Sequence, residues 1–121
     1  MYNPRVVDHF NNPRNVGILD GADAQASVEN PVCGDLINLY IKVEDGRIKR
    51  SSFQAFGCSA AIASSSIATE LIQDKTLDEA LKITSDTVVG ALEGLPSSKM
   101  HCAGMAADVI HKAVKNYLDK K

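Results

Sequence analysis

The chain has 121 residues, of which 45% are hydrophobic and 23% charged, and it carries a net charge of −2. This length fits one domain, residues 1–121, which can bury enough surface to fold without disulfides. The charge balance lacks the basic patch typical of nucleic-acid binding, and no apolar run approaches the ~20 residues of a membrane span. The first ten residues show no signal-peptide pattern, so we expect a cytoplasmic protein with neither nucleic acid nor membrane among its partners.

The beginning of the chain predicts a short helix over residues 4–10. Asn3 suits the N-cap position and Pro4 the first helical position, because proline has no N–H to leave unsatisfied there. Residues 21–30 predict a weak strand or a loop.

A β-hairpin is the clearest prediction. Residues 36–43 alternate between apolar and polar side chains, residues 44–46 read Glu-Asp-Gly as a turn, and residues 47–56 form the return strand. Phe53 and Phe56 are out of phase in the second strand, and a β-bulge would explain this.

Helices follow the hairpin. Residues 59–73 are rich in alanine and serine with almost no charge, which predicts a buried helix. A capping-box pattern opens a short helix over residues 76–83, another is expected over 86–92, and a long amphipathic helix over 100–118. Strands followed by helices predict an α+β fold, a small three-stranded antiparallel sheet with helices packed on one face.

The three cysteines are an odd number, which does not suggest a disulfide framework. Cys33 directly precedes the first hairpin strand and Cys58 directly follows the second. Paired strands therefore bring both to the open end of the hairpin. Cys102 begins the last helix, so the three sulfur atoms converge if the N-terminus of that helix packs against this open end.

The residues beside the cysteines suit a site for thiolates. Gly34 and Gly57 allow close backbone approach or a positive φ. Helix N-termini after Cys58 and at Cys102, together with Lys99, are expected to lower the thiol pKa. Asp35 and His101 add one oxygen and one nitrogen ligand candidate. On these residues alone, a metal or sulfur site and plain buried cysteines both remain open.

Four segments closely resemble the IscU family and the N-terminal domain of NifU: residues 8–17, 30–35, 56–66 and 99–102. The resemblance covers nearly the whole chain in order. It implies a scaffold rather than an enzyme. Such a scaffold takes sulfur from a cysteine desulfurase of the IscS or NifS type, iron, and electrons from a donor such as a ferredoxin. It builds a transient [2Fe–2S] cluster and passes it to apo-proteins, either as a monomer or as a cluster-bridged oligomer.

The resemblance also implies roles for residues. The implied cluster ligands are Cys33, Cys58 and Cys102. His101 matches a proposed fourth ligand, Asp35 an aspartate thought to coordinate iron and keep the cluster labile, and Lys99 a residue lining the site. Zinc often occupies this site in the family when iron is absent, which suits sulfur ligands with a histidine or aspartate.

One departure concerns the loop that an Hsp70-type chaperone reads in the family. There the loop is usually Leu-Pro-Pro-Val-Lys, whereas residues 95–99 here read Leu-Pro-Ser-Ser-Lys. Losing one proline and the valine removes stiffness and apolar contact, so we expect weaker chaperone docking.

Two other functions would leave different signatures in the sequence. A zinc-bound sulfur acceptor of the SufU type would carry an insertion between the second and third cysteines and no histidine beside the third, unlike this chain. A cysteine hydrolase or transferase would need a histidine base. His9 is expected on the surface of the first helix and His111 on the polar face of the last. His101 shows no evident orienting partner in the sequence.

Overall fold

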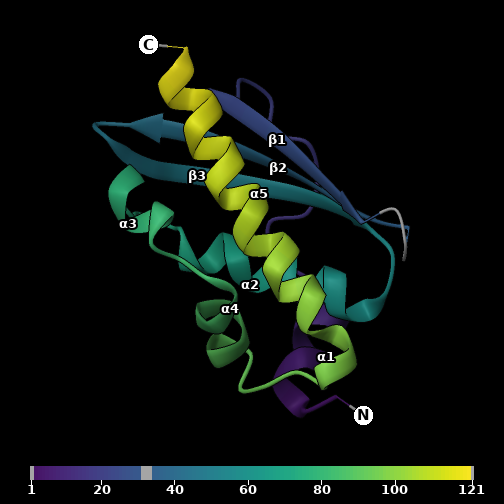
Figure 1. The fold of residues 1–121 in the computed structure, drawn as a ribbon. Helices are drawn as coiled ribbons and strands as arrows, with labels where there is room; N and C mark the ends of the chain where they lie inside the picture. Colours follow the sequence, from purple (N-terminus) through teal and green to yellow (C-terminus); the bar gives the residue numbers. More distant parts are fainter. Residues whose placement is uncertain (1, 31–33, 121) are drawn as a thin grey trace.

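The computed structural model describes residues 2–30 and 34–120. Three antiparallel strands form one sheet in the order β1 (Ala24–Asn30), β2 (Asp35–Glu44) and β3 (Arg47–Phe56). The long helix α5 (Met100–Asp119) crosses one face of this sheet, and the other helices gather on the same side (Figure 1). The predicted α+β class, with helices on one face of a three-stranded sheet, is confirmed.

The hairpin of β2 and β3 closes through Asp45 and Gly46, whose φ angles of 54° and 74° match the turn that suits two-residue hairpins. Val43 pairs with Ile48 and Lys42 with Arg50, so Lys49 is an extra residue in β3. The predicted bulge therefore exists. It brings Ile48 and Phe53 onto the helix-covered face.

The bulge does not account for Phe56. This residue pairs with Leu36 at the end of β3, and its side chain is 54% exposed. Phe53, by contrast, is 1% exposed and belongs to the core. The extra residue lies before both phenylalanines, so it shifts both side chains together and leaves them on opposite faces of the sheet. The expectation that one bulge puts both phenylalanines in phase is therefore wrong.

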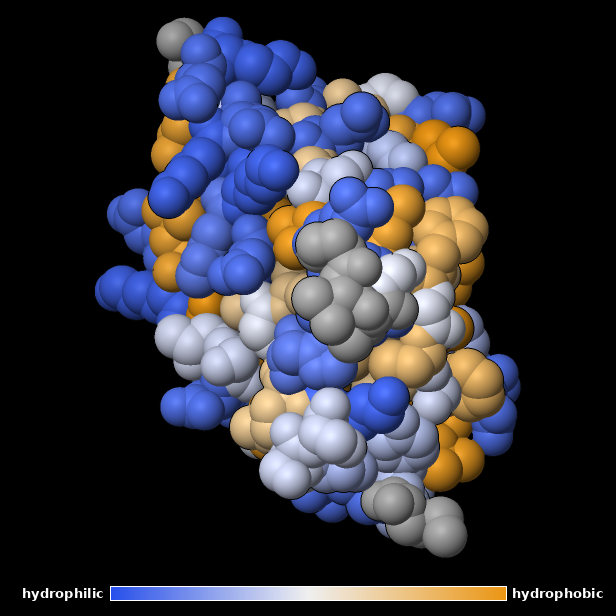
Figure 2. All heavy atoms as spheres, turned by 45° about the vertical axis from the view of Figure 1, so that its right-hand side comes forward, coloured by the Kyte–Doolittle hydropathy of each residue, from blue (hydrophilic) through white to orange (hydrophobic). Residues whose placement is uncertain are grey.

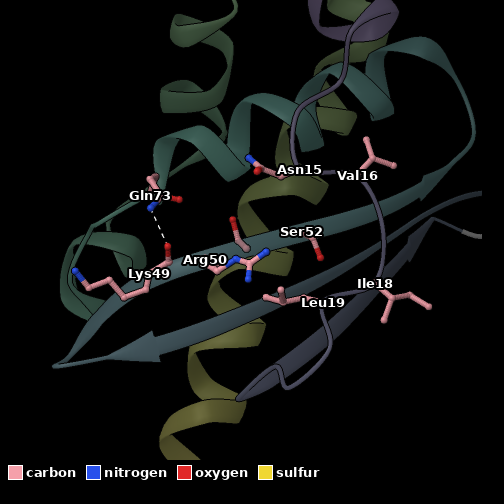
Figure 3. A pocket seen from close by; sticks show the side chains of 9 residues that line it. Asn15, Val16, Ile18, Leu19, Lys49, Arg50, Ser52 and Gln73 are labelled. Carbon is pink, nitrogen blue, oxygen red and sulfur yellow. Dashed lines mark hydrogen bonds between the residues drawn. The ribbon is translucent and has the colours of Figure 1, made fainter.

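Helix α1 (Pro4–Asn11) starts as predicted, with the Asn3 side chain accepting a hydrogen bond from the Val6 N–H. Residues 15–17 then lie along the outer edge of β3. Here the Gly17 N–H donates to the Phe53 carbonyl at 2.8 Å, and the Phe53 N–H donates to the Asn15 carbonyl at 2.9 Å. The chain crosses to β1 over the sheet face that the helices leave free (Figure 3).

Helix α2 (Ser59–Leu71) is buried on most of its surface, as its small residues predict. It is followed by α3 (Leu77–Leu81), α4 (Ser85–Ala91) and the 3₁₀ turn η1 (Ser97–Lys99). Both short helices begin with a capping box, at Thr76 and at Thr84. The main core joins the helix-covered face of the sheet to α2 and α5. Its largest buried apolar side chains are Phe53, Ile37, Leu39, Ile41, Ile48, Ile72, Leu92 and Ile110.

His9 is not on the surface, contrary to the prediction. It is 1% exposed, with Nδ1 at 2.8 Å from Ser66 Oγ and Nε2 at 3.4 Å from Glu70 Oε1 on α2. His111 is half-buried, with Nε2 at 2.6 Å from the Ile83 carbonyl oxygen. Within residues 2–30 and 34–120, no helix has the length and apolar character needed to cross a bilayer.

Candidate metal centre

Three elements end at the same place. Asp35 is the first residue of β2, Cys58 is the N-cap of α2, and Cys102 lies in the first turn of α5. The pairing of Leu36 with Phe56 sets Asp35 beside the chain that leaves β3 toward Cys58. The hairpin therefore brings Asp35 and Cys58 together, and α5 adds Cys102.

The side chains are close enough to bind one metal ion together. Cys58 Sγ lies 3.6 Å from Cys102 Sγ, and Asp35 Oδ2 lies 3.9 Å from each sulfur. Asp35 is 3% exposed and Cys102 is fully buried, whereas Cys58 is half-buried. The site is thus deep at Asp35 and Cys102 and partly accessible at Cys58.

These distances fit a tetrahedral metal. Metal–sulfur bonds of about 2.3 Å and a metal–oxygen bond of about 2.1 Å would set the sulfur–sulfur edge at about 3.8 Å and each sulfur–oxygen edge at about 3.6 Å. The observed sulfur–sulfur distance of 3.6 Å and sulfur–oxygen distances of 3.9 Å differ from those values by only a few tenths of an ångström. Sulfur and carboxylate donors in this arrangement suit zinc or iron.

Gly57 holds the carboxylate in position. Its φ of +144° is one that side chains rarely adopt, and a β-carbon built there would overlap the Asp35 carboxylate. The next residue, Cys58, donates its backbone N–H to Asp35 Oδ1 at 3.2 Å. Asp35 therefore packs directly on a glycine backbone, with its other oxygen turned to the sulfur atoms.

His101 lies against the same group. Its Nε2 is 3.4 Å from Asp35 Oδ2 and 3.5 Å from Cys102 Sγ. Asp35 is thus the orienting partner of His101 that the sequence did not reveal, because the two are 66 positions apart. His101 can approach as a nitrogen ligand or donate a proton to a neighbouring sulfur or oxygen.

Burial decides the protonation of Cys102. It raises the pKa of this thiol, and the nearby Cys58 raises it further, while Lys99 opposes the shift. The expectation of a lowered pKa at this helix N-terminus is therefore wrong for Cys102 in the metal-free protein, because desolvation outweighs the helix dipole. A bound metal would reverse this, since a coordinating thiol is deprotonated.

Lys99 places a positive charge beside the site. The negative charge of Cys58, and after it that of Tyr2, raises the pKa of the Lys99 ammonium group. Lys99 therefore stays protonated and attracts anionic sulfur that arrives beside Cys58.

The small residues behind the sulfurs are a feature that the sequence analysis did not assign to the site. Ala60 and Ala61 on α2 are fully buried and pack with Cys102. Their small side chains let the N-termini of α2 and α5 approach closely enough for the two sulfurs to meet. The alanine and serine run after Cys58 was the available signal.

Two of the predicted residues are placed less fully. Cys33 lies outside the described residues, so its ligand role stays a prediction. Gly34 has a φ of +74°, and its N–H donates to the carbonyl of Asn30, the last residue of β1, at 2.7 Å.

Comparison with known proteins gives a consistent result. The model of the NifU-like N terminal domain matches residues 1–121. "Iron-sulfur cluster assembly scaffold protein IscU 1" of Archaeoglobus fulgidus is 57% identical over 120 residues, which cover 99% of this chain and 78% of that protein.

Two solved structures share the fold. One is a nitrogen-fixing NifU-like protein (N-terminal) from Brucella abortus, with a TM-score of 0.82 and 21% identity over 98% of this chain and 95% of that one. The other, from Fervidobacterium islandicum, is described as a cluster assembly scaffold for the SUF system. It has a TM-score of 0.80 and 18% identity over 93% and 96% of the two chains. From the family match and the identity to the archaeal relative, the chain belongs to the NifU-like N-terminal domain family.

Proposed function

We propose that this protein is a scaffold on which iron–sulfur clusters are assembled. The observation that carries the proposal is the convergence of Asp35, Cys58 and Cys102, whose ligand atoms all lie within 4.8 Å of one another. The relative that is 57% identical bears the name of such a scaffold. In this proposal the metal and sulfide are cargo, and the chain supplies a largely buried set of ligands.

The product is a [2Fe–2S] cluster held by Cys33, Cys58 and Cys102, with His101 or Asp35 as the remaining ligand. Cys58 is the more accessible of the two described thiols, and Lys99 beside it favours arriving anionic sulfur. Cys102 is buried and binds as a thiolate once metal is present to displace its proton. The same burial argues against a free nucleophile at Cys102.

Asp35 makes the cluster transferable. A carboxylate is a harder and more exchangeable iron ligand than a thiolate, so an acceptor thiolate can replace it. Among residues 2–30 and 34–120, Asp35 Oδ1 accepts a hydrogen bond from the Cys58 backbone N–H alone, and a carboxylate held this lightly can swing aside. Zinc is a second occupant of the same ligands when iron is absent.

The partners follow from this cycle. A cysteine desulfurase supplies sulfur, a ferredoxin-type donor supplies electrons, and apo-proteins accept the cluster. The loop over residues 95–99 departs from the family pattern, so an Hsp70-type chaperone is expected to dock weakly there. A cytoplasmic location remains a prediction.

Anaerobic reconstitution tests the proposal. The protein is incubated with ferrous iron, a cysteine desulfurase, cysteine and a thiol reductant that supplies the electrons for sulfide formation, and the visible absorption of a [2Fe–2S] cluster is followed. Serine replacement of Cys33, Cys58 or Cys102 should abolish the cluster. Asp35→Ala should give a longer-lived cluster that transfers slowly to an apo-ferredoxin.

Gly104→Ala on α5 is the control, because nothing within 4 Å would meet the added methyl group. Persulfide formed on the protein without any cluster absorption would favour the zinc-bound sulfur acceptor instead. Clusters formed equally well by all three serine variants would reject the site altogether.

A further inference from the structure

A pocket lies at the edge of β3, and its lining includes no residue of the candidate metal centre. Its volume is about 340 Å³, within the range of small-molecule sites. Figure 3 shows side chains from the segment after α1, from β3 and from the end of α2 lining one hollow. Its lining includes Val16, Ile18, Lys49, Arg50, Ser52 and Gln73.

The β-bulge gives this pocket its charge. In a regular strand, Lys49 and Arg50 would point to opposite faces, but Ile48 and Ser51 on either side of them are both buried. The extra residue at Lys49 lets two consecutive cationic side chains be exposed while the buried pattern continues on both sides. Bulges re-aim side chains in this way near functional sites.

The two cations are not neutralised by acidic groups in the pocket. The Arg50 guanidinium has no hydrogen-bond or ion-pair partner in the described part of the chain. Lys49 Nζ is 3.9 Å from Asp74 Oδ1, a long and exposed pair. Among the described lining residues there is no Asp or Glu. The guanidinium of Arg50 therefore remains available to a planar anion such as a carboxylate or phosphate.

A buried hydroxyl faces the same space. Ser52 is 7% exposed, and its Oγ has no hydrogen-bond partner among the described residues. Ser52 pairs with Tyr40 on the sheet face opposite the core helices, and Figure 3 shows its oxygen turned toward Ile18 and Leu19. A buried hydroxyl without a partner is destabilising, and a bound acceptor would satisfy it.

The backbone of β3 adds a further donor. The N–H and carbonyl of Phe53 form hydrogen bonds with residues 15–17, on the side of β3 away from β2. Phe53 and Leu39 are therefore a pair in the β2–β3 ladder that exchanges no hydrogen bonds. Hydrogen-bonded and non-bonded pairs alternate along an antiparallel ladder. The Ser51 N–H, two residues earlier, therefore also points outward, into the gap between residues 15–17 and Gln73.

One wall of the pocket is apolar. Val16 and Ile18 are 58% and 66% exposed, and Leu19 beside them is buried. A bare inorganic ion would leave this wall in water, whereas a ligand with an apolar body would cover it. The pocket thus combines a cationic, hydroxyl-lined end with an apolar end.

We propose that this pocket binds a small organic molecule that carries a phosphate or carboxylate group on an apolar body. The anionic group takes the Arg50 fork and the Ser52 hydroxyl, and the exposed Lys49 ammonium, which points away from them in Figure 3, adds positive charge nearby. The apolar body lies against Val16 and Ile18. This site is independent of the proposed cluster chemistry, since it uses none of those residues.

The test is a titration of the ¹⁵N-labelled protein followed by NMR. Phenyl phosphate and benzoate represent the two anionic groups on one apolar body, inorganic phosphate lacks the body, and benzyl alcohol lacks the charge. We expect saturable shifts of the Arg50, Ser51 and Ser52 amides with at least one aromatic anion. Inorganic phosphate should bind more weakly, and benzyl alcohol should leave these amides unshifted.

Variants decide whether the pocket is responsible. Arg50→Gln should weaken binding about tenfold or more, and Ser52→Ala roughly two- to tenfold. Lys115→Gln on α5 removes the same charge outside the pocket and should leave affinity unchanged. Shifts that do not saturate, or affinities equally reduced in Lys115→Gln and Arg50→Gln, would overturn the proposal. A stronger response to phenyl phosphate than to benzoate identifies the phosphate as the group bound, and the reverse identifies the carboxylate.

Discussion

At the scale of single residues, the candidate metal centre depends on a glycine as much as on its ligands. Gly57 combines a φ of +144° with a backbone against which Asp35 rests. Gly57→Ala should therefore displace the carboxylate and strain the backbone. We expect a stability loss of more than about 1 kcal/mol and zinc affinity lowered about 10- to 100-fold. Zinc affinity is measured by competition with a chelating dye, and stability by urea unfolding.

Gly104→Ala is again the matched control for this prediction. Gly104 lies two residues beyond Cys102 inside α5, with a regular helical backbone and open space for a methyl group. Its replacement should raise stability by roughly 0.5–1 kcal/mol and leave zinc affinity unchanged. Equal zinc affinities for Gly57→Ala and Gly104→Ala would show that the position of Asp35 does not depend on Gly57.

His9 gives a second prediction at this scale, on pH. Desolvation lowers its pKa, and Arg14 lowers it further, while Glu70 opposes the shift. The folded state thus favours neutral His9 more than the unfolded state does. Its contribution to stability is complete above a pH of about 6.5 and is lost as the pH falls below that value.

Urea unfolding between pH 7.5 and pH 5 measures this effect. The free energy of unfolding should fall toward pH 5, and the slope should be smaller in His9→Gln, which cannot titrate there. The two proteins differ only at residue 9, so the difference between the two curves belongs to His9. Parallel curves would exclude His9 as the source.

At the scale of elements, the side chain of Asn3 links the start of α1 to the end of α4, just before the loop that leads to Cys102. Asn3 Oδ1 caps α1, while its Nδ2 donates to the carbonyls of Leu92, Glu93 and Gly94 at 3.0–3.1 Å. These carbonyls end α4 and lead into the loop before α5. One side chain therefore closes the start of one helix and the end of another.

Substitutions at Asn3 separate the two roles. Asn3→Ala loses both and should destabilise the protein by about 1–3 kcal/mol, while Asn3→Ser keeps the cap and should be the milder change. Asn3→Asp keeps the cap but sets a carboxylate against three carbonyl oxygens, so it should be less stable than Asn3→Ser. Urea unfolding ranks the three variants. An order with Asn3→Asp the most stable would contradict the tethering role.

Local signals explain what the sequence could predict at this scale. The hairpin follows from alternation and an Asp-Gly turn, and α1 from an asparagine and a proline, all within a few residues. The approach of Asp35 to Cys58 follows from hairpin topology, whereas Cys102 reaches them only through the packing of α5. His9 was misplaced because its partner Ser66 is 57 positions away. The raised pKa of Cys102 depends on packing against Ala60 and Ala61, which no local pattern reveals.

At the scale of the whole molecule, the metal centre joins parts of the fold that are distant in sequence. Asp35 brings in the start of β2, Cys58 the start of α2, and Cys102 the start of α5. In the metal-free protein, this junction brings together a buried carboxylate and a buried thiol. A metal ion would satisfy both and cross-link the sheet to its two core helices. Metal binding should therefore stabilise the entire fold, not only the site.

Zinc in excess should raise the free energy of unfolding by about 2.7 kcal/mol when its free concentration is 100 times the dissociation constant. Urea titrations with zinc and with a chelator, both under reducing conditions, measure this as a shift in midpoint with an unchanged slope. The shift should vanish in Cys102→Ser and persist in Gly104→Ala. Zinc that stabilised Cys102→Ser as much as the parent would have to bind elsewhere. A changed slope would mean that zinc also binds the unfolded chain, whose three cysteines can still reach it.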